Sequence, residues 1–256
     1  MYPVRAQGQP DSAVCASGSE TASGQDLIYG GRFEAATLFF SQLAARFPLD
    51  PVGPALAASA LIWQGAAIPD DDFMADSIDA LLADAAARAE RGLEGAATDS
   101  ARVVQLFWLG TALGYRARQA DLHGHPWRAS REAMAMRDAL ERALALDSTC
   151  VDCELGLAIY DYALARAGAL ARLVATIIGM GGGDAPLAMR RMRHVEEAGT
   201  LARFEAQWVY ANALVRESGS DDLLRLEARR LVGDLAVRFP DNPVFRRFLD
   251  STTTPQ

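Results

Sequence analysis

The chain has 256 residues, enough for one large domain or two small ones with a substantial core, and half of them are hydrophobic, which argues against wholesale disorder. Its formal charge of −8 argues against a general phosphate-binding face, so we expect no nucleic-acid partner. All 25 cationic residues are arginine, which excludes enzymes that depend on a Schiff-base, P-loop or kinase-type lysine.

The first segment, residues 1–23, is rich in Gly, Ser, Ala, Gln and Pro and has no apolar periodicity, so we predict a disordered tail. No basic region and apolar run precede the small residues of Val4-Arg5-Ala6, so the chain as given predicts a cytoplasmic location. A leader remnant, with a periplasmic or cell-envelope location, is the alternative if an upstream signal peptide has been lost. Cys15 in SAVC is similar to a lipoprotein box, but Val14 and the missing apolar run argue against lipidation.

Residues 24–250 are predicted to form one helical domain, because apolar residues recur at steps of three and four between short Gly, Pro or Asp breaks. The predicted helices cover residues 25–30, 32–47, 52–66, 71–92, 98–121, 126–146, 150–166, 168–179, 184–198, 200–217, 220–239 and 243–250. Alternating β-branched runs with hairpin turns are absent from the sequence, so the predicted fold class is all-α. The last residues, 251–256, are predicted to be a second disordered tail.

The stretch GGRFEAATLFFSQLAARFP, residues 30–48, indicates how the helices pair. Helical geometry places four of its residues on one stripe that needs a partner helix: Phe33, Ala36, Phe40 and Leu43. Gly31 permits a tight turn before this helix, and Pro48 stops it. We therefore predict a helix hairpin in which Ala36 allows close approach and Phe40 fills the gap between neighbouring pairs.

These residues resemble the second helix of the tetratricopeptide repeat (TPR) family, which follows a Gly-x-aromatic-x-x-Ala-x-x-x-Phe-x-x-Ala-x-x-x-x-Pro pattern. Only Leu43, where the family usually has Ala, departs from it. More degenerate copies are marked by Trp108-Leu109-Gly110, by Leu155-Gly156, and by Ala228, Val232, Leu235 and Pro240. The resemblance implies a TPR-like α-solenoid of about four or five stacked antiparallel helix pairs. The region around residues 156–192 also resembles uncharacterised bacterial TPR-type proteins.

The TPR resemblance implies a superhelix whose concave groove binds a protein or peptide, so we expect a non-enzymatic scaffold without a cofactor. The family's lysine-based clamp for a C-terminal carboxylate has no counterpart here, because the chain has no lysine. Aromatic residues and arginines on the first helix of each pair are the expected groove contacts, because they dominate binding hot spots. The candidates are Trp108, Tyr115, Arg116, Tyr160, Tyr162, Arg203, Trp208 and Tyr210.

The segment GALARLVATIIGMGGGD, residues 168–184, is almost wholly apolar. A membrane span needs about 20 apolar residues and Arg172 interrupts this run, so no transmembrane segment is predicted. The expected structure is a buried helix with a glycine C-cap. One alternative is a patch that docks on a membrane surface or a partner; another is a mobile lid, which would make this an apolar small-ligand or lipid-binding helical protein.

Cys150 and Cys153 form the motif CVDC at a predicted helix start, where a helix N-terminus stabilises thiolates. A thioredoxin-like motif needs a βαβ frame, and c-type haem needs a histidine where this chain has Glu154. We therefore expect reduced or buried structural thiols without zinc. A disulfide, within the motif or to Cys15, is the alternative for an exported protein, and metal or redox chemistry is the third.

Three polar clusters have simple structural explanations. Asp121, His123 and His125 lie in a Gly-Pro loop without the spacing of a helical two-histidine site, so no metal site is predicted. The acidic residues of 69–73 fit a helix N-terminus, and the arginines of 189–194 fit a solvated helix face. No Ser-His-Asp set, carboxylate pair or Gly-rich phosphate loop is recognisable, so enzymatic activity is not expected.

Overall fold

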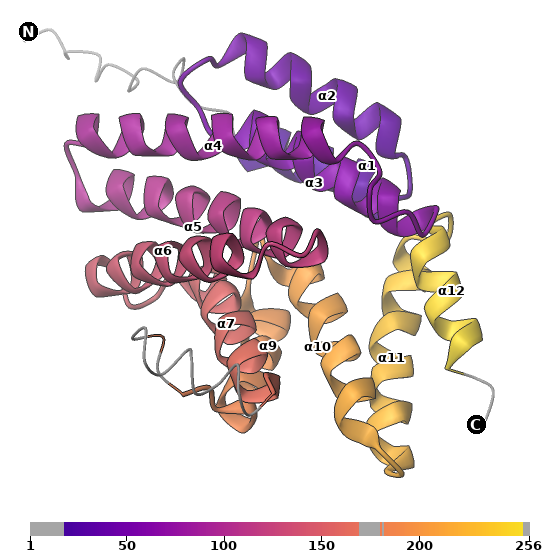
Figure 1. Cartoon of the computed structure of the whole chain (residues 1–256). Helices are drawn as coiled ribbons and strands as arrows, with labels where there is room; N and C mark the ends of the chain where they lie inside the picture. Colours follow the sequence, from indigo (N-terminus) through magenta and orange to yellow (C-terminus); the bar gives the residue numbers. More distant parts are fainter. Residues whose placement is uncertain (1–17, 169–179, 181, 253–256) are drawn as a thin grey trace, which may run out of the picture.

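The structure is a computed structural model that describes residues 18–168, 180 and 182–252, and every regular element within them is helical (Figure 1). The elements are α1 (Gly18–Tyr29), α2 (Phe33–Arg46), α3 (Val52–Ala67), α4 (Ala75–Gly95), α5 (Asp99–Leu122), α6 (Pro126–Leu146), η1 (Val151–Cys153), α7 (Glu154–Arg166), α9 (Ala185–Ala198), α10 (Arg203–Ser218), α11 (Asp222–Arg238) and α12 (Pro243–Ser251). The predicted all-α class is confirmed for the described part of the chain.

Four helix starts differ from the prediction by three residues or more: α1, α4, α7 and α10 begin at Gly18, Ala75, Glu154 and Arg203, where starts at 25, 71, 150 and 200 were expected. Helix α1 begins at Gly18, so residues 18–23, which we expected in the disordered tail, are helical. Its buried residues include Thr21 and Gly24, which give no apolar periodicity for a sequence pattern to detect. The CVDC motif forms the short 3-10 turn η1 before α7, and not the first turn of one continuous helix. The helix predicted over 168–179 lies outside the described residues, apart from Gly168.

The stripe predicted for residues 32–47 is confirmed in α2. Its buried residues are Phe33, Ala36, Phe40 and Leu43, and Phe40 is 0% exposed. Gly31 makes the preceding turn with a φ of +74°, a left-handed conformation that favours glycine. The chain leaves α2 at Phe47, whose backbone N–H donates to the carbonyl of Leu43 before Pro48. The turn at Gly31, the buried stripe of α2 and the helix end before Pro48 therefore agree with the prediction.

Successive helices pack against one another along the chain, and Figure 1 shows them stacked with α10 between α9 and α11. Helices α1, α3, α5 and α7 also contact one another in that order. This arrangement is compatible with a stack of helix hairpins whose first helices form one row, although the pairs α7–α9 and α10–α11 are turned relative to the first ones (Figure 1).

The last helix returns to the first part of the stack, because α12 contacts α3. Asn242 is fully buried, and its Nδ2 donates to the backbone carbonyl of Tyr29 at 2.9 Å. A Cβ at Gly31 would lie 2.9 Å from the carbonyl oxygen of Asp241, so the α1–α2 and α11–α12 turns are in close contact. Arg247 of α12 donates to the carbonyl of Ala66 at 2.8 Å. Contacts far apart in sequence therefore join the two ends of the described helical stack.

In the described part of the chain, no helix combines the length and the apolar character that crossing a membrane would require.

Candidate functional site

A surface pocket of about 450 Å³ lies between α7, α9 and α10. Its lining residues are Ile159, Tyr162 and Ala163 of α7, Met192 of α9, and Trp208, Val209, Asn212, Ala213 and Arg216 of α10. Most are apolar, whereas Asn212 and Arg216 are exposed polar members. A pocket with this lining suits an apolar group that has a polar or anionic neighbour.

Helical spacing places these side chains in the pocket. On α7 the lining residues follow steps of three and four, starting at Ile159, and on α10 they follow the same steps from Trp208 to Arg216. Each helix therefore turns one stripe toward the pocket. The pocket therefore lies where α7, α9 and α10 meet.

An aromatic cluster supports Trp208 from behind. Its members come from α1, α3, α10, α12 and the end of α11: Tyr29, Trp63, Phe204, Trp208, Phe239, Phe245 and Phe248. The ring of Trp208 lies 5.6 Å from that of Trp63 and 5.7 Å from that of Phe245, measured between centroids. Such contacts hold large rings in fixed orientations. One wall of the pocket is therefore part of a rigid core.

Glu205, one turn before Trp208 on α10, places a carboxyl group at the edge of this cluster. Its Oε2 accepts hydrogen bonds from Trp63 Nε1 at 3.2 Å and from the hydroxyl of Tyr29 at 3.4 Å. Burial raises the pKa of Glu205, and this effect is opposed by the Trp63 hydrogen bond and the Arg118 charge. The carboxyl group therefore links the start of α10 to α1 and α3.

Tyr115 of α5, a predicted groove contact, joins the same group. Burial and the charge of Glu205 both raise the pKa of the Tyr115 hydroxyl, whereas its hydrogen bond with Ser59 lowers it. Tyr115 is half-buried and Arg118, one turn later, is exposed. We call Glu205, Tyr29, Trp63 and Tyr115 the Glu205 cluster, to which α5 contributes Tyr115.

Ion pairs border the α7–α10 pocket. The hydroxyl of Tyr162 donates to Glu217 at 2.7 Å, and Arg166 forms an ion pair with the same carboxylate. Arg191 of α9 pairs with Asp161 of α7 at 2.8 Å. These pairs neutralise the charges beside the pocket, and within the described residues no ion pair joins Arg216 to an acidic residue. The local charge at the rim is therefore positive.

The eight predicted groove residues have different environments. Trp108, Tyr160 and Tyr162 are buried, and Tyr115, Trp208 and Tyr210 are half-buried. Arg116 pairs with the buried Glu132 at 3.1 Å, and Arg203 is exposed and donates to the backbone carbonyl of Glu196 at 3.2 Å. The structure brings only Tyr162 and Trp208 of this set together in one pocket. Sequence reasoning missed Glu205 and Trp63, because a glutamate in a first helical turn also suits the helix dipole and its partner Trp63 is remote in sequence.

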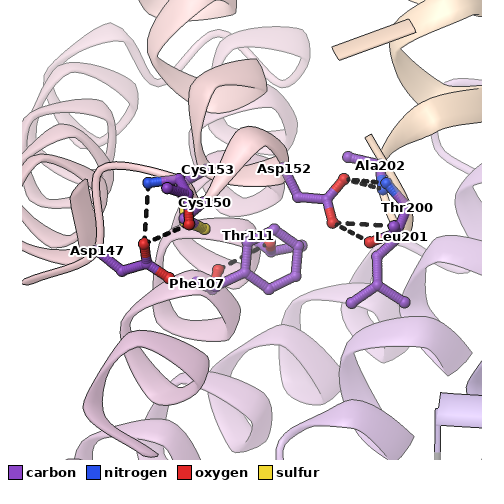
Figure 2. Close-up of a disulfide and its surroundings, with 10 residues drawn as sticks. Phe107, Thr111, Asp147, Cys150, Asp152, Cys153, Thr200, Leu201 and Ala202 are labelled. Carbon is purple, nitrogen blue, oxygen red and sulfur yellow. Dashed lines mark hydrogen bonds between the residues drawn. A yellow bond between two sulfur atoms is a disulfide. The ribbon is translucent and has the colours of Figure 1, made fainter. Parts of the chain in front are cut away.

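The expectation of reduced cysteines is wrong, because Cys150 and Cys153 form a disulfide. The η1 turn brings their Cα atoms to 5.4 Å, which a disulfide can bridge. Between them, Asp152 accepts hydrogen bonds from the loop that enters α10 (Figure 2). The alternative of a disulfide within the motif is therefore the correct one.

The other polar clusters form hydrogen bonds and ion pairs within the protein. His123 donates through Nδ1 to the carbonyl of Gln119 at 2.7 Å, and its Nε2 lies 3.4 Å from Asp72. In the basic run, Arg193 pairs with Glu197 at 2.9 Å and His194 with Glu154 at 3.1 Å. No group of three or more His, Cys, Asp or Glu suited to a metal ion occurs among the residues that the structure describes.

A second hollow of about 470 Å³ is formed by the α5–α6 connection alone, from Gly124 to Arg128, and includes Trp127, which is 71% exposed. Because one short segment forms it, its shape depends on that segment only. The α7–α10 pocket is instead built by three helices and supported by a core cluster, so it is the stronger candidate site.

Comparison of the chain with known protein families and with curated proteins gives no match. Over the residues that the structure describes, the protein is all-helical and has a pocket between α7, α9 and α10.

Proposed function

We propose that the chain is a non-enzymatic, TPR-like scaffold that binds a peptide segment of a partner protein on the row of first helices. The observation that carries the proposal is the α7–α10 pocket, which combines half-buried Trp208 with exposed Ile159, Asn212 and Arg216. Aromatic residues and arginine supply most of the binding energy at protein interfaces. The bound segment inserts an apolar or aromatic side chain and places an acidic group toward Arg216.

A library of peptides displayed on phage tests this proposal with the purified, oxidised protein. Selected peptides are expected to carry an apolar anchor next to an acidic residue. Ala163→Trp places an indole in the pocket from an exposed position on α7 and is expected to weaken binding at least about 30-fold. The matched control is Ala83→Trp at an exposed position of α4.

A second pair of variants removes an aromatic group in place of adding one. Trp208→Ala is expected to weaken the selected peptides strongly, whereas Trp127→Ala, which removes an exposed tryptophan outside the pocket, has no effect. Thermal midpoints identify any variant that loses binding through unfolding. Peptide binding that survives both Ala163→Trp and Trp208→Ala would contradict the proposal.

The alternative function is the binding of a small apolar ligand or lipid, with residues 168–184 as a lid. The pocket volume of about 450 Å³ favours it, because small-molecule sites have volumes of about 300–1,000 Å³. Most of the lid segment lies outside the described residues. Extraction of the purified protein into organic solvent, followed by mass spectrometry, tests this alternative: one stoichiometric apolar molecule would support it over the peptide scaffold.

A further inference from the structure

The side chain of Asp152 holds the loop that leads into α10 (Figure 2). Its two oxygens accept four hydrogen bonds: from the backbone N–H and hydroxyl of Thr200 at 2.8 and 2.7 Å, and from the N–H groups of Leu201 and Ala202, both at 3.1 Å. A carboxylate that accepts several such bonds fixes the backbone strongly. We call this set of contacts the Asp152 clamp.

The disulfide fixes the position of the clamp. Asp152 is the residue between the two linked positions and belongs to η1, in which the N–H of Cys153 donates to the carbonyl of Cys150 at 3.1 Å. The loop approaches so closely that a Cβ at Gly199 would lie 2.8 Å from Asp152 Oδ1. Small changes in the η1 turn are therefore transmitted to the clamped loop, because the contact leaves no space between them.

The clamped loop positions the helix that forms the pocket. Helix α10 begins at Arg203, directly after the loop, and carries Glu205 in its first turn and the pocket residues from Trp208 onward. On the opposite side, Gln25 of α1 donates to the carbonyl of Leu201 at 2.9 Å. The start of α10 thus has three anchors: the Asp152 clamp, the Gln25 contact and the Glu205 cluster. The clamp is the one that a covalent bond holds in place.

We propose that the Cys150–Cys153 disulfide is a redox control of the α7–α10 pocket, and that its reduction releases the Asp152 clamp and loosens the start of α10. The inference rests on the proposed function in so far as this pocket is the binding site. The inference concerns how the binding site is regulated, and the reduction requires a dithiol as the reductant.

The chemistry is ordinary thiol–disulfide exchange. A thiolate of the dithiol attacks Sγ of Cys150, which is half-buried, whereas Cys153 is fully buried. The Cys150–Cys153 bond breaks, and Cys153 leaves as a thiolate at the N-terminus of α7, where the helix dipole stabilises it until it takes a proton. The second thiol of the reductant then displaces Cys150 and forms its own disulfide. Two electrons and two protons pass to the protein.

Hydrogen exchange measured by mass spectrometry tests the inference on the full chain. All proteins carry Cys15→Ser, so that the remaining two of the three cysteines are those of the disulfide. Complete reduction by dithiothreitol, verified by alkylation and mass, is expected to accelerate exchange of residues 199–206 at least about tenfold. Exchange in α2, which lies outside the clamp, is expected to change less than twofold. Acceleration of the same size in both segments would mean global loosening and would overturn the inference.

Two variants separate the disulfide from the clamp. The double variant Cys150→Ser, Cys153→Ser is expected to exchange like the reduced protein without any reductant. Asp152→Ala retains both cysteines and is expected to exchange fast at residues 199–206 when oxidised, with less than a twofold further change on reduction. If reduction instead accelerates exchange equally in the Cys15→Ser parent and in Asp152→Ala, the clamp does not carry the effect. Unchanged exchange in the double variant overturns the inference as well.

Binding provides a readout that is independent of exchange. A peptide selected on the oxidised protein is expected to bind the reduced protein at least about tenfold more weakly, and Asp152→Ala at least about tenfold more weakly in either state. If the proposed function is wrong, the selected peptides bind the oxidised Ala163→Trp variant as tightly as the oxidised parent protein. Failure of the redox inference shows itself as equal exchange at residues 199–206 in the oxidised and reduced protein.

Discussion

Phe40 is the side chain on which the predicted hairpin most depends, and it is fully buried in α2, with its ring 5.3 Å from that of Phe39. Phe40→Ala is expected to lower the free energy of unfolding by about 3–5 kcal/mol, because the neighbouring helices cannot close the cavity completely. Leu38→Ala, at a position 60% exposed on the same helix, is the control. Urea titration followed by circular dichroism measures both, and a loss below about 1 kcal/mol for Phe40→Ala would contradict the packing role.

Glu205 gives the stability of the protein a defined pH dependence. Because burial raises its pKa, the folded state holds this proton at pH values where the unfolded state has released it. The contribution of Glu205 to stability is therefore complete below the unfolded-state pKa and is lost as the pH rises through the folded-state pKa. Glu205→Gln keeps an acceptor oxygen without the ionisation, so the variant should gain stability relative to wild type between about pH 4 and about pH 8.

The matched control for this experiment is Glu227→Gln. The hydrogen bond from Arg230 lowers the pKa of Glu227, so its contribution is present above the unfolded-state pKa and is lost as the pH falls. The variant should lose stability relative to wild type over the same rise in pH. Thermal midpoints across the pH range measure both differences, and a difference for Glu205→Gln that does not change with pH would refute the assignment.

At the scale of helices, Arg88 of α4 terminates α2. Its Nη1 donates to the backbone carbonyls of Ala44 and Phe47 at 3.1 and 3.2 Å, and its Nη2 pairs with Asp84 at 2.8 Å. Carbonyls at a helix end need such donors, and the planar guanidinium reaches several at once. One side chain of α4 thus caps the end of α2.

Arg88→Met is expected to lower the free energy of unfolding by about 1.5–3 kcal/mol, because methionine keeps the packing of the side chain but donates no hydrogen bond. Arg91→Met, at an exposed position one turn further along α4, should change it by less than about 0.5 kcal/mol. Denaturant titration compares the two variants. Equal effects would show that the capping bonds contribute little.

Helix positions were predictable where apolar residues follow helical spacing, as in α2, and less so where they do not. The first turns of α1 bury Thr21 and Gly24, residue types that are equally common in tails.

In the candidate site, Tyr162 and Trp208 were predictable because large aromatic residues on a helix are obvious candidates for contacts. Glu205 was not, since a glutamate in a first helical turn also suits the helix dipole, and its partners Tyr29 and Trp63 are remote in sequence.

For the whole molecule, the bond between Asn242 and Tyr29 joins positions 213 residues apart. Asn242→Asp keeps the acceptor that caps Val244 at the start of α12 but removes the donor to Tyr29 and adds a charge at a fully buried position. The variant is expected to lose at least about 2 kcal/mol of stability. Asp221→Ala, which removes only the N-cap of α11, should cost about 1 kcal/mol. Calorimetry that finds the two variants equally stable would contradict a role for this bond in joining the ends.

The contact between the two ends also limits how such a chain can evolve in length. In an array whose repeats contact only their neighbours, the gain or loss of one repeat changes only the interfaces next to it. Here an inserted or deleted hairpin between residues 29 and 242 would shift α12 away from α3, separate Arg247 from Ala66 and expose the rings of Trp63 and Phe245 together. The contact therefore constrains how the helices between these two ends can change, and relatives are expected to vary in their loops more than in the number of these helices.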